Sequence, residues 1–225
     1  MIVDLHAHTN FSKDASDDPE ALVQKMIDCG VQVFGITDHN YWIRGIEKKQ
    51  NAAIRKLAEK YKDKIKIYCG IELSTHPSWA LTDFSVPKAY DYALIENVDE
   101  PESVTGGDLF GYAEKVGISC GVAHTDLCAY AETIGVSPEE YFGKMAKAGI
   151  FWEMNVNYDT THGHHEHEYV KRFFASEKEH EIIRNSGVYL SVGFDGHRME
   201  DYDVLRVKTA CEKIEEWGLN LKTKF

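Results

Sequence analysis

Two pairs of polar residues, one near each end of the sequence, have a spacing that suits metal binding. His6 and His8 are two residues apart, and so are Asp195 and His197. On an extended strand, side chains at positions i and i+2 point to the same side, so each pair could bind one metal ion. Imidazole suits zinc, iron or manganese, whereas carboxylates suit harder ions and can bridge two metals. The mixture of His and Asp therefore predicts a polynuclear hydrolytic metal centre.

Further polar residues follow the apolar runs that separate these two pairs. In chain order they are Asp38, His39, Glu72, Asp99, His124, Glu153 and Asn155. A single His-x-His pair is a weak signal, because histidines near strand ends often form only surface hydrogen bonds. The ordered series is more specific, because the carboxyl ends of parallel strands converge on one open face. We expect one shared site there, in which Glu153 and Asn155 either orient the metal ligands or satisfy backbone groups at the strand end, the first being favoured.

A centre of this kind would supply its own nucleophile. Coordination lowers the pKa of water, so a hydroxide that bridges two metal ions is available at neutral pH. The ions would also stabilise the negative charge that develops on a phosphoryl oxygen. The predicted chemistry therefore needs no side-chain nucleophile.

The elements that would position these residues alternate along the chain. Seven short runs rich in β-branched and aromatic residues lie at 2–5, 33–37, 66–72, 92–95, 118–124, 150–155 and 188–195. Polar stretches with helical spacing lie between them, including 19–29 and 44–61, and glycines such as Gly30, Gly117 and Gly149 stand as helix stops just before strands. Alternating strands and helices predict a parallel sheet. The close spacing of the units predicts an α/β fold, a compact (β/α)7 TIM-like barrel.

The composition limits the class of protein. A chain of 225 residues with 43% hydrophobic residues suits one domain, 1–225, with one buried core. The five cysteines lack paired spacing, which predicts reduced thiols rather than disulfides. No apolar run is long enough to cross a bilayer and the first residues lack a signal-peptide pattern, so we expect a cytoplasmic protein without membrane partners. The net charge of −12 argues against binding of duplex nucleic acid.

Five segments taken together resemble one known family. They are MIVDLHAHTNFSKD, ITDHN, GIELS, GVAH and GFDGH, in that order and at the predicted strand ends. The set is similar to the motifs of the PHP (polymerase and histidinol phosphatase) family, and the match extends from His6 to His197. Each segment alone is weak, but the ordered set is highly specific. The resemblance implies a distorted seven-stranded βα barrel with a trinuclear metal site and phosphoesterase activity.

The resemblance also implies which residues bind each metal. The first ion would be held by His6, His8, Glu72 and Asp195, the second by Glu72 and His124, and the third by Asp14, His39 and His197. The chain departs from the family pattern after the predicted fourth strand, where LIENVDE stands in place of a segment with a histidine. Asp99 is the predicted replacement ligand there, with Glu96 as the alternative.

The resemblance also implies an arginine that holds phosphate, and the small, acidic chain favours a small substrate over a long polyanion. Arg198, directly after His197, is the predicted phosphate-binding residue, because its planar guanidinium matches phosphate oxygens. We expect two or three divalent ions, zinc, manganese or iron, and a small phosphomonoester as substrate. One alternative is an exonuclease or other phosphodiesterase that acts on short oligonucleotides or nucleotides. The other is a non-catalytic, metal-binding regulatory module.

The two longest irregular stretches, 75–90 and 156–168, could form lids over the site. The second contains HGHHEH, a composition that is also typical of a solvated loop binding stray metal. Both interpretations stay open, and no residue of this loop is among the predicted ligands. Tyr41 and Trp42, after ITDHN, are more typical of packing than of a pocket wall. The sequence gives no indication of an oligomeric state.

Overall fold

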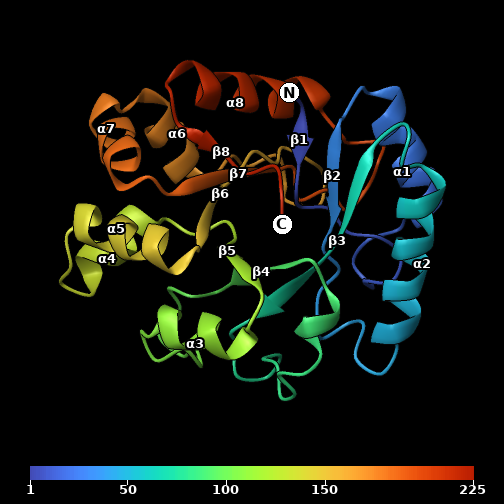
Figure 1. Cartoon of the computed structure of the whole chain (residues 1–225), viewed down its shortest axis with the longest axis horizontal. Coiled ribbons are helices and arrows are strands. Elements are labelled where there is room, and N and C mark those ends of the chain that lie inside the picture. Colours follow the sequence, from blue (N-terminus) through green and yellow to red (C-terminus); the bar gives the residue numbers. More distant parts are fainter.

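The computed structural model describes residues 1–225 and consists of parallel strands surrounded by helices (Figure 1). The strands are β1 (Val3–Asp4), β2 (Val33–Ile36), β3 (Lys66–Ser74), β4 (Tyr92–Glu96), β5 (Ser119–Val122), β6 (Phe151–Asn155), β7 (Tyr189–Gly193) and β8 (Asn220–Leu221). The α-helices are α1 (Pro19–Asp28), α2 (Glu47–Lys60), α3 (Leu109–Val116), α4 (Leu127–Thr133), α5 (Pro138–Ala148), α6 (Glu168–Ala175), α7 (Glu177–Ser186) and α8 (Val204–Glu216), and a short 3-10 helix, η1, spans Pro87–Ala89.

Each strand pairs in parallel with the next strand along the chain, from β1 to β8. The sheet also curls back on itself, because the segment that begins with β1 lies beside β7. The backbone N–H of Leu5 donates to the carbonyl of Val192 at 2.8 Å, and the N–H of Asp195 donates to the carbonyl of His6 at 2.8 Å. The predicted α/β, TIM-like barrel is therefore confirmed, with its helices on the outside (Figure 1).

The predicted strand count is the one difference in the fold. All seven predicted strands are present, but Asn220–Leu221 forms an additional β8 that pairs with Tyr189 and Leu190 of β7. A strand of two residues is too short to show alternation in the sequence. Its conformation comes from pairing with β7, which is a tertiary interaction.

Helix boundaries follow local signals. Asp18 caps α1 by accepting hydrogen bonds from the N–H groups of Glu20 and Ala21, and Pro19 occupies the first helical turn. Gly117 and Gly149 end α3 and α5 with φ of 73° and 70°, a left-handed conformation that glycine adopts without strain. The helix predicted over 44–61 is shorter than expected and begins only at Glu47.

The amino ends of the strands are closed by aromatic side chains. Phe225 stacks on Tyr92 of β4 with ring centroids 4.1 Å apart, and its backbone lies inside the ring of strands in Figure 1. The hydroxyl of Tyr92 donates to the carbonyl of Leu5 at 2.5 Å. Gly70 leaves space for this ring, since a Cβ there would lie 2.6 Å from it. The barrel is therefore filled at this end, and its open face is the opposite one.

Two further expectations can be compared with the structure. All five cysteines are free thiols, as predicted, and four of them are buried. None of the helices combines the length and the apolar character needed to span a membrane.

Candidate metal centre

The carboxyl ends of the strands carry a dense group of histidines and carboxylates. It contains His6 and His8 after β1, His39 after β2, Glu72 within β3, Glu96 at the end of β4, His124 after β5, and Asp195 and His197 after β7. These side chains come from segments far apart in the chain, and His8 and Asp195, for example, are separated by 187 residues. Their convergence follows from the barrel, since parallel neighbours all end at the same face.

His6, His8, Glu72 and Asp195 form the tightest part of this group. The Nε2 of His6 lies 3.1 Å from the Nε2 of His8, 3.3 Å from Oε1 of Glu72 and 3.3 Å from Oδ1 of Asp195. The Nε2 of His8 lies 3.1 Å from the same Asp195 oxygen and 3.4 Å from Oε2 of Glu72. Ligand atoms about 2.1 Å from a tetrahedral zinc ion lie about 3.4 Å from one another. The spacing of these four side chains therefore fits one metal ion.

Two buried atoms beside this cluster support the same conclusion. The Nδ1 of His39 and Oε2 of Glu72 are 2.8 Å apart, yet neither atom forms a hydrogen bond of suitable geometry. A buried carboxylate oxygen without a well-aligned hydrogen-bond donor is costly, because it has lost its hydration. A cation would satisfy it. These two buried atoms, neither of which forms a hydrogen bond, are evidence for a metal centre that does not depend on the sequence motifs.

Glu96, which the sequence suggested only as the alternative to Asp99, lies near His124. The Nε2 of His124 lies 3.2 Å from Oε1 of Glu72 and 3.8 Å from Oε2 of Glu96. The other oxygen of Glu96 lies 3.7 Å from the Nδ1 of His39. Asp99, the predicted ligand, lies on an exposed turn after the chain has left β4. The structure therefore brings Glu96, and not Asp99, to the histidines.

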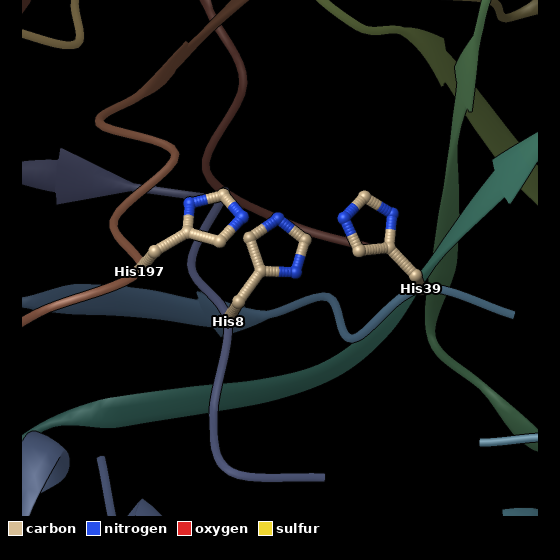
Figure 2. A group of neighbouring side chains, drawn as sticks. All are labelled: His8, His39 and His197. Carbon is tan, nitrogen blue, oxygen red and sulfur yellow. The ribbon is translucent and has the colours of Figure 1, made fainter. Parts of the chain in front are cut away.

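Three histidine rings line the other side of the centre, as Figure 2 shows for His8, His39 and His197. Ring centroids are 4.3 Å apart for His8 and His39, and 4.4 Å apart for His8 and His197. One ligand atom from each of the three lies within 4.8 Å of the others. Oδ2 of Asp14 lies 3.4 Å from the Nε2 of His39 and accepts a hydrogen bond from the indole N–H of Trp42 at 3.0 Å. Asp14 therefore also lies beside the cluster.

The centre combines groups whose ionisation is strongly altered. Burial would lower the pKa of His6, but the negative charges of Asp195 and other carboxylates outweigh burial and raise it. Burial raises the pKa of Glu96 to about 7, and the charge of Glu72 adds to this effect. Burial lowers the pKa of His8 to about 3. The imidazole of His8 is therefore neutral at pH 7.

Glu153 of β6 orients two of the histidines. Its Oε1 lies 2.7 Å from the Nδ1 of His6, and its Oε2 accepts a hydrogen bond from the backbone N–H of His124 at 2.9 Å. Gly193 provides the space for this contact, because a Cβ there would lie 2.1 Å from Oε1 of Glu153. A carboxylate on the second ring nitrogen is the common way to orient a metal-binding histidine. The geometry agrees with the orienting role predicted for Glu153.

Two of the predicted ligands have an unfavourable backbone conformation. The φ angles of His124 and Asp195 are 24° and 56°, in a region that non-glycine residues rarely adopt. The side-chain amide of Asn155 donates to Oδ2 of Asp195 at 3.2 Å and so helps to hold it. Such conformations persist where the surrounding structure imposes them, and they are concentrated at functional sites.

Two further side chains, Arg198 and His162, belong to segments next to the centre. Arg198 is exposed, and its guanidinium forms no ion pair within the chain. His162, from the loop 156–168, points its Nε2 towards the centre, 3.6 Å from Oδ2 of Asp195. His162 could not be singled out from sequence alone, because HGHHEH contains four histidines of similar context.

A model of the PHP domain family matches residues 4–192. The chain belongs to the PHP domain family. Family membership confirms the resemblance found in the motifs. It also confirms the predicted enzyme class, a metal-dependent phosphoric-ester hydrolase.

Solved structures with the same fold include other PHP proteins. Histidinol phosphate phosphatase (HISK) from Lactococcus lactis subsp. lactis Il1403, in complex with zinc, L-histidinol and phosphate, is 18% identical with a TM-score of 0.66, and the alignment covers 99% of this PHP chain and 96% of that chain. A Listeria monocytogenes protein described as histidinol phosphatase hisK is 15% identical with a TM-score of 0.56, covering 88% of this chain and 96% of its own. At these identities the likeness concerns the fold. No curated protein matches the chain in sequence.

Proposed function

We propose that this PHP domain hydrolyses a small phosphomonoester with the help of two or three divalent metal ions. The observation that carries the proposal is the cluster of His6, His8, Glu72 and Asp195, whose ligand atoms lie 3.1 to 3.4 Å apart. The complex of the similar histidinol phosphate phosphatase with zinc, L-histidinol and phosphate supports a small phosphorylated substrate.

Three groups of residues would hold the ions. They are His6, His8, Glu72 and Asp195; Glu72, Glu96 and His124; and Asp14, His39 and His197. Glu72 belongs to two groups, which suits a carboxylate that bridges two ions. The nitrogen and oxygen donors accept zinc, manganese or iron. When bound, the ions supply a nucleophile by lowering the pKa of water, and they stabilise charge on the phosphoryl oxygens.

Other residues of the chain would orient the ligands and the substrate. Glu153 holds the Nδ1 of His6, so that the Nε2 faces the centre. Burial and the charge of Glu96 raise the pKa of Tyr41, so its hydroxyl stays protonated and can donate to a phosphate oxygen. Arg198 remains our proposed phosphate-binding residue, because its guanidinium has no partner within the chain and it follows His197 directly.

A phosphomonoester is preferred over a nucleic acid for electrostatic reasons. The net charge of −12 repels a long polyanion, whereas a small phosphate ester needs only the local positive charge of the bound ions. The proposed substrate therefore has one phosphate and a small organic group.

The test combines elemental analysis with two assays. Metal content of the purified protein is measured first, and hydrolysis of an aryl phosphate and of a phosphate diester is then followed before and after chelation. Two or more ions per chain and chelator-sensitive release of phosphate from the monoester are expected. Faster cleavage of the diester would favour a phosphodiesterase. Full metal content without turnover of either ester would contradict a catalytic function.

A further inference from the structure

The first inference concerns His162, which lies outside the motifs of the family. We propose that His162 is an additional metal ligand, supplied by the loop 156–168 to the ion that His197 helps to hold, and that Asp159 orients it. The proposal rests on the metal centre described above and adds a residue to it.

Asp159 fixes the ring of His162. The side chain of Asp159 is fully buried, and its Oδ1 accepts a hydrogen bond from the backbone N–H of His162 at 2.8 Å. The same oxygen lies 2.7 Å from the Nδ1 of His162. With its Nδ1 proton donated to a carboxylate, a neutral imidazole presents the lone pair of Nε2 to a metal. This is the relationship that Glu153 has with His6.

The free nitrogen of His162 points into the centre. It lies 3.6 Å from Oδ2 of Asp195, and the ring of His162 meets the ring of His197 edge-on with centroids 5.1 Å apart. The Nδ1 of His197 lies 3.0 Å from the carbonyl of Asp195, which leaves its Nε2 available as a ligand. One ligand atom from each of Asp159, His162 and His197 lies within 4.8 Å of the others. The imidazoles of His162 and His197 therefore lie beside the same part of the centre.

Hydrogen bonds and an ion pair join the loop 156–168 to the segment after His197 and to α8. The N–H of Thr160 donates to Oδ2 of Asp201 at 3.3 Å, in the segment that follows His197. Arg206 of α8 donates to the carbonyl of Val156 at 3.1 Å and forms an ion pair with Glu166. These contacts hold the loop at the rim of the centre, so His162 is placed before any ion arrives. Such pre-organisation favours a ligand role over that of a solvated loop residue.

The test compares two histidines of one loop. His162→Ala and the control His165→Ala, whose side chain is exposed, are prepared as metal-free proteins and titrated with Co²⁺, followed by its visible absorption, and with Zn²⁺ against a chromophoric chelator. His162→Ala is expected to bind one equivalent at least about tenfold more weakly, with an altered cobalt spectrum. Asp159→Asn should weaken the same equivalent by a smaller factor. His165→Ala should match the wild type.

Unchanged stoichiometry, affinity and cobalt spectrum in His162→Ala would overturn the inference. Unchanged metal binding together with weaker inhibition by inorganic phosphate would also overturn it, because His162 would then contact phosphate instead. Circular dichroism checks that each variant is folded. Because the readout is metal binding, the inference can hold even if no phosphate ester is hydrolysed, and the two proposals are thereby tested separately.

A second, independent observation concerns the aromatic rim, which we define as Tyr41, His76 and Trp79. The ring of Tyr41 stacks on the metal-facing ring of His39 at 4.8 Å and 27°. Trp79 stacks on Tyr41 at 5.2 Å and 27°, and His76 lies 4.8 Å from Trp79. Trp79 is nevertheless 47% exposed. An unbroken series of rings therefore leads from the metal centre to the surface.

The aromatic rim is held in place by Asn40, the residue after His39. Its buried side chain donates to the carbonyl of Trp79 at 2.9 Å and accepts a hydrogen bond from the N–H of Ser74 at 3.0 Å. The tryptophan is thus fixed beside the centre while much of its surface stays open. Planar groups such as bases stack on side chains of this kind. We infer that the organic group of the substrate is planar and aromatic, such as a nucleobase or aryl group, and stacks on this rim.

This second inference rests on the proposed phosphomonoesterase activity. Trp79→Ala is compared with the wild type on a nucleoside monophosphate, on phenyl phosphate and on glycerol phosphate. The kcat/KM for the two aromatic esters should fall at least about fivefold, with glycerol phosphate unaffected. Tyr189→Ala, an exposed aromatic residue at the amino end of β7, is the control and should behave as the wild type. Equal effects on all esters, or none, would overturn the inference. Absence of turnover by the wild type would instead contradict the proposed function.

Discussion

Oε1 of Glu153 lies 2.7 Å from the Nδ1 of His6, and this contact joins β6 to the segment after β1 across the interior of the barrel. It determines which nitrogen of His6 faces the other ligands. A proton on Nδ1 is donated to the carboxylate, so the Nε2 lone pair is left for a metal. Glu153 lies outside the five motif segments, yet the geometry of the centre depends on it.

Replacing Glu153 with Gln should weaken metal binding by about tenfold, because the neutral amide orients His6 less strongly and presents an N–H where the N–H of His124 now donates. Competition with a chromophoric chelator for Zn²⁺ measures the change. Glu181→Gln, an exposed position on α7, is the matched control. Wild-type affinity in Glu153→Gln would show that the contact has no orienting role.

Glu96 and Asp99 offer a direct comparison between two carboxylates three residues apart. Glu96→Gln should reduce metal content and lower kcat by roughly tenfold or more, since a ligand beside His124 is lost. Asp99→Asn should match the wild type, because Asp99 lies on an exposed turn. Metal analysis and hydrolysis of an aryl phosphate distinguish the two. The reverse pattern would restore Asp99 as the ligand.

Arg198→Ala should raise KM for phosphate esters by about tenfold, equivalent to about 1.4 kcal/mol, without changing metal content. Arg198→Lys should recover only part of the loss, because an ammonium group lacks the planar fork of the guanidinium. Steady-state kinetics on several esters provide the test. A rise of less than about twofold for every ester would remove Arg198 from the phosphate site.

A stability prediction concerns Asp126, which caps α4 and accepts two hydrogen bonds from Arg172 of α6 at 2.6 and 2.8 Å. Burial would raise the pKa of Asp126, but the hydrogen bonds from Arg172 outweigh burial and lower it. The folded pKa is therefore below the unfolded value of about 3.9, so the stabilisation is present above about pH 4 and is lost as the pH falls through the folded pKa.

Asp126→Asn keeps the helix cap but removes the charge. It should reduce the free energy of unfolding by about 0.5 to 1 kcal/mol at pH 7, since the pair is partly exposed to solvent. Urea unfolding at pH 7 and at progressively lower pH measures the free energy of unfolding of the wild type and of Asp126→Asn. The difference between the two proteins should become smaller below about pH 4. A difference that is the same at every pH would contradict the electrostatic explanation.

The sequence was sufficient for the barrel and for most of the residues at its open face. The predicted strands each contain enough β-branched and aromatic residues to be recognised, and the polar residue after each one is positioned by the strand itself. For this reason the sequence predicts His6, His39, Glu72 and Asp195 as members of one site, and the structure brings them together.

The remaining features depend on tertiary geometry. LIENVDE contains several carboxylates, and only the point at which β4 ends decides that Glu96 faces His124 while Asp99 faces solvent. The histidines of HGHHEH are equivalent in composition, and the contact with Asp159 distinguishes His162. The spacing of residues along the chain predicts neither the position of Glu96 nor the contact between Asp159 and His162.

The hydrogen bonds between the segment after β1 and the region of β7 have a consequence for how the protein folds. His8 and Asp195, which lie 3.1 Å apart, are separated by 187 residues, so the centre cannot exist until nearly the whole ring of strands has formed. Contacts this distant in sequence form late, because the entropy of closing the chain must be overcome first. Metal ions would therefore slow unfolding of the completed barrel far more than they would accelerate its folding.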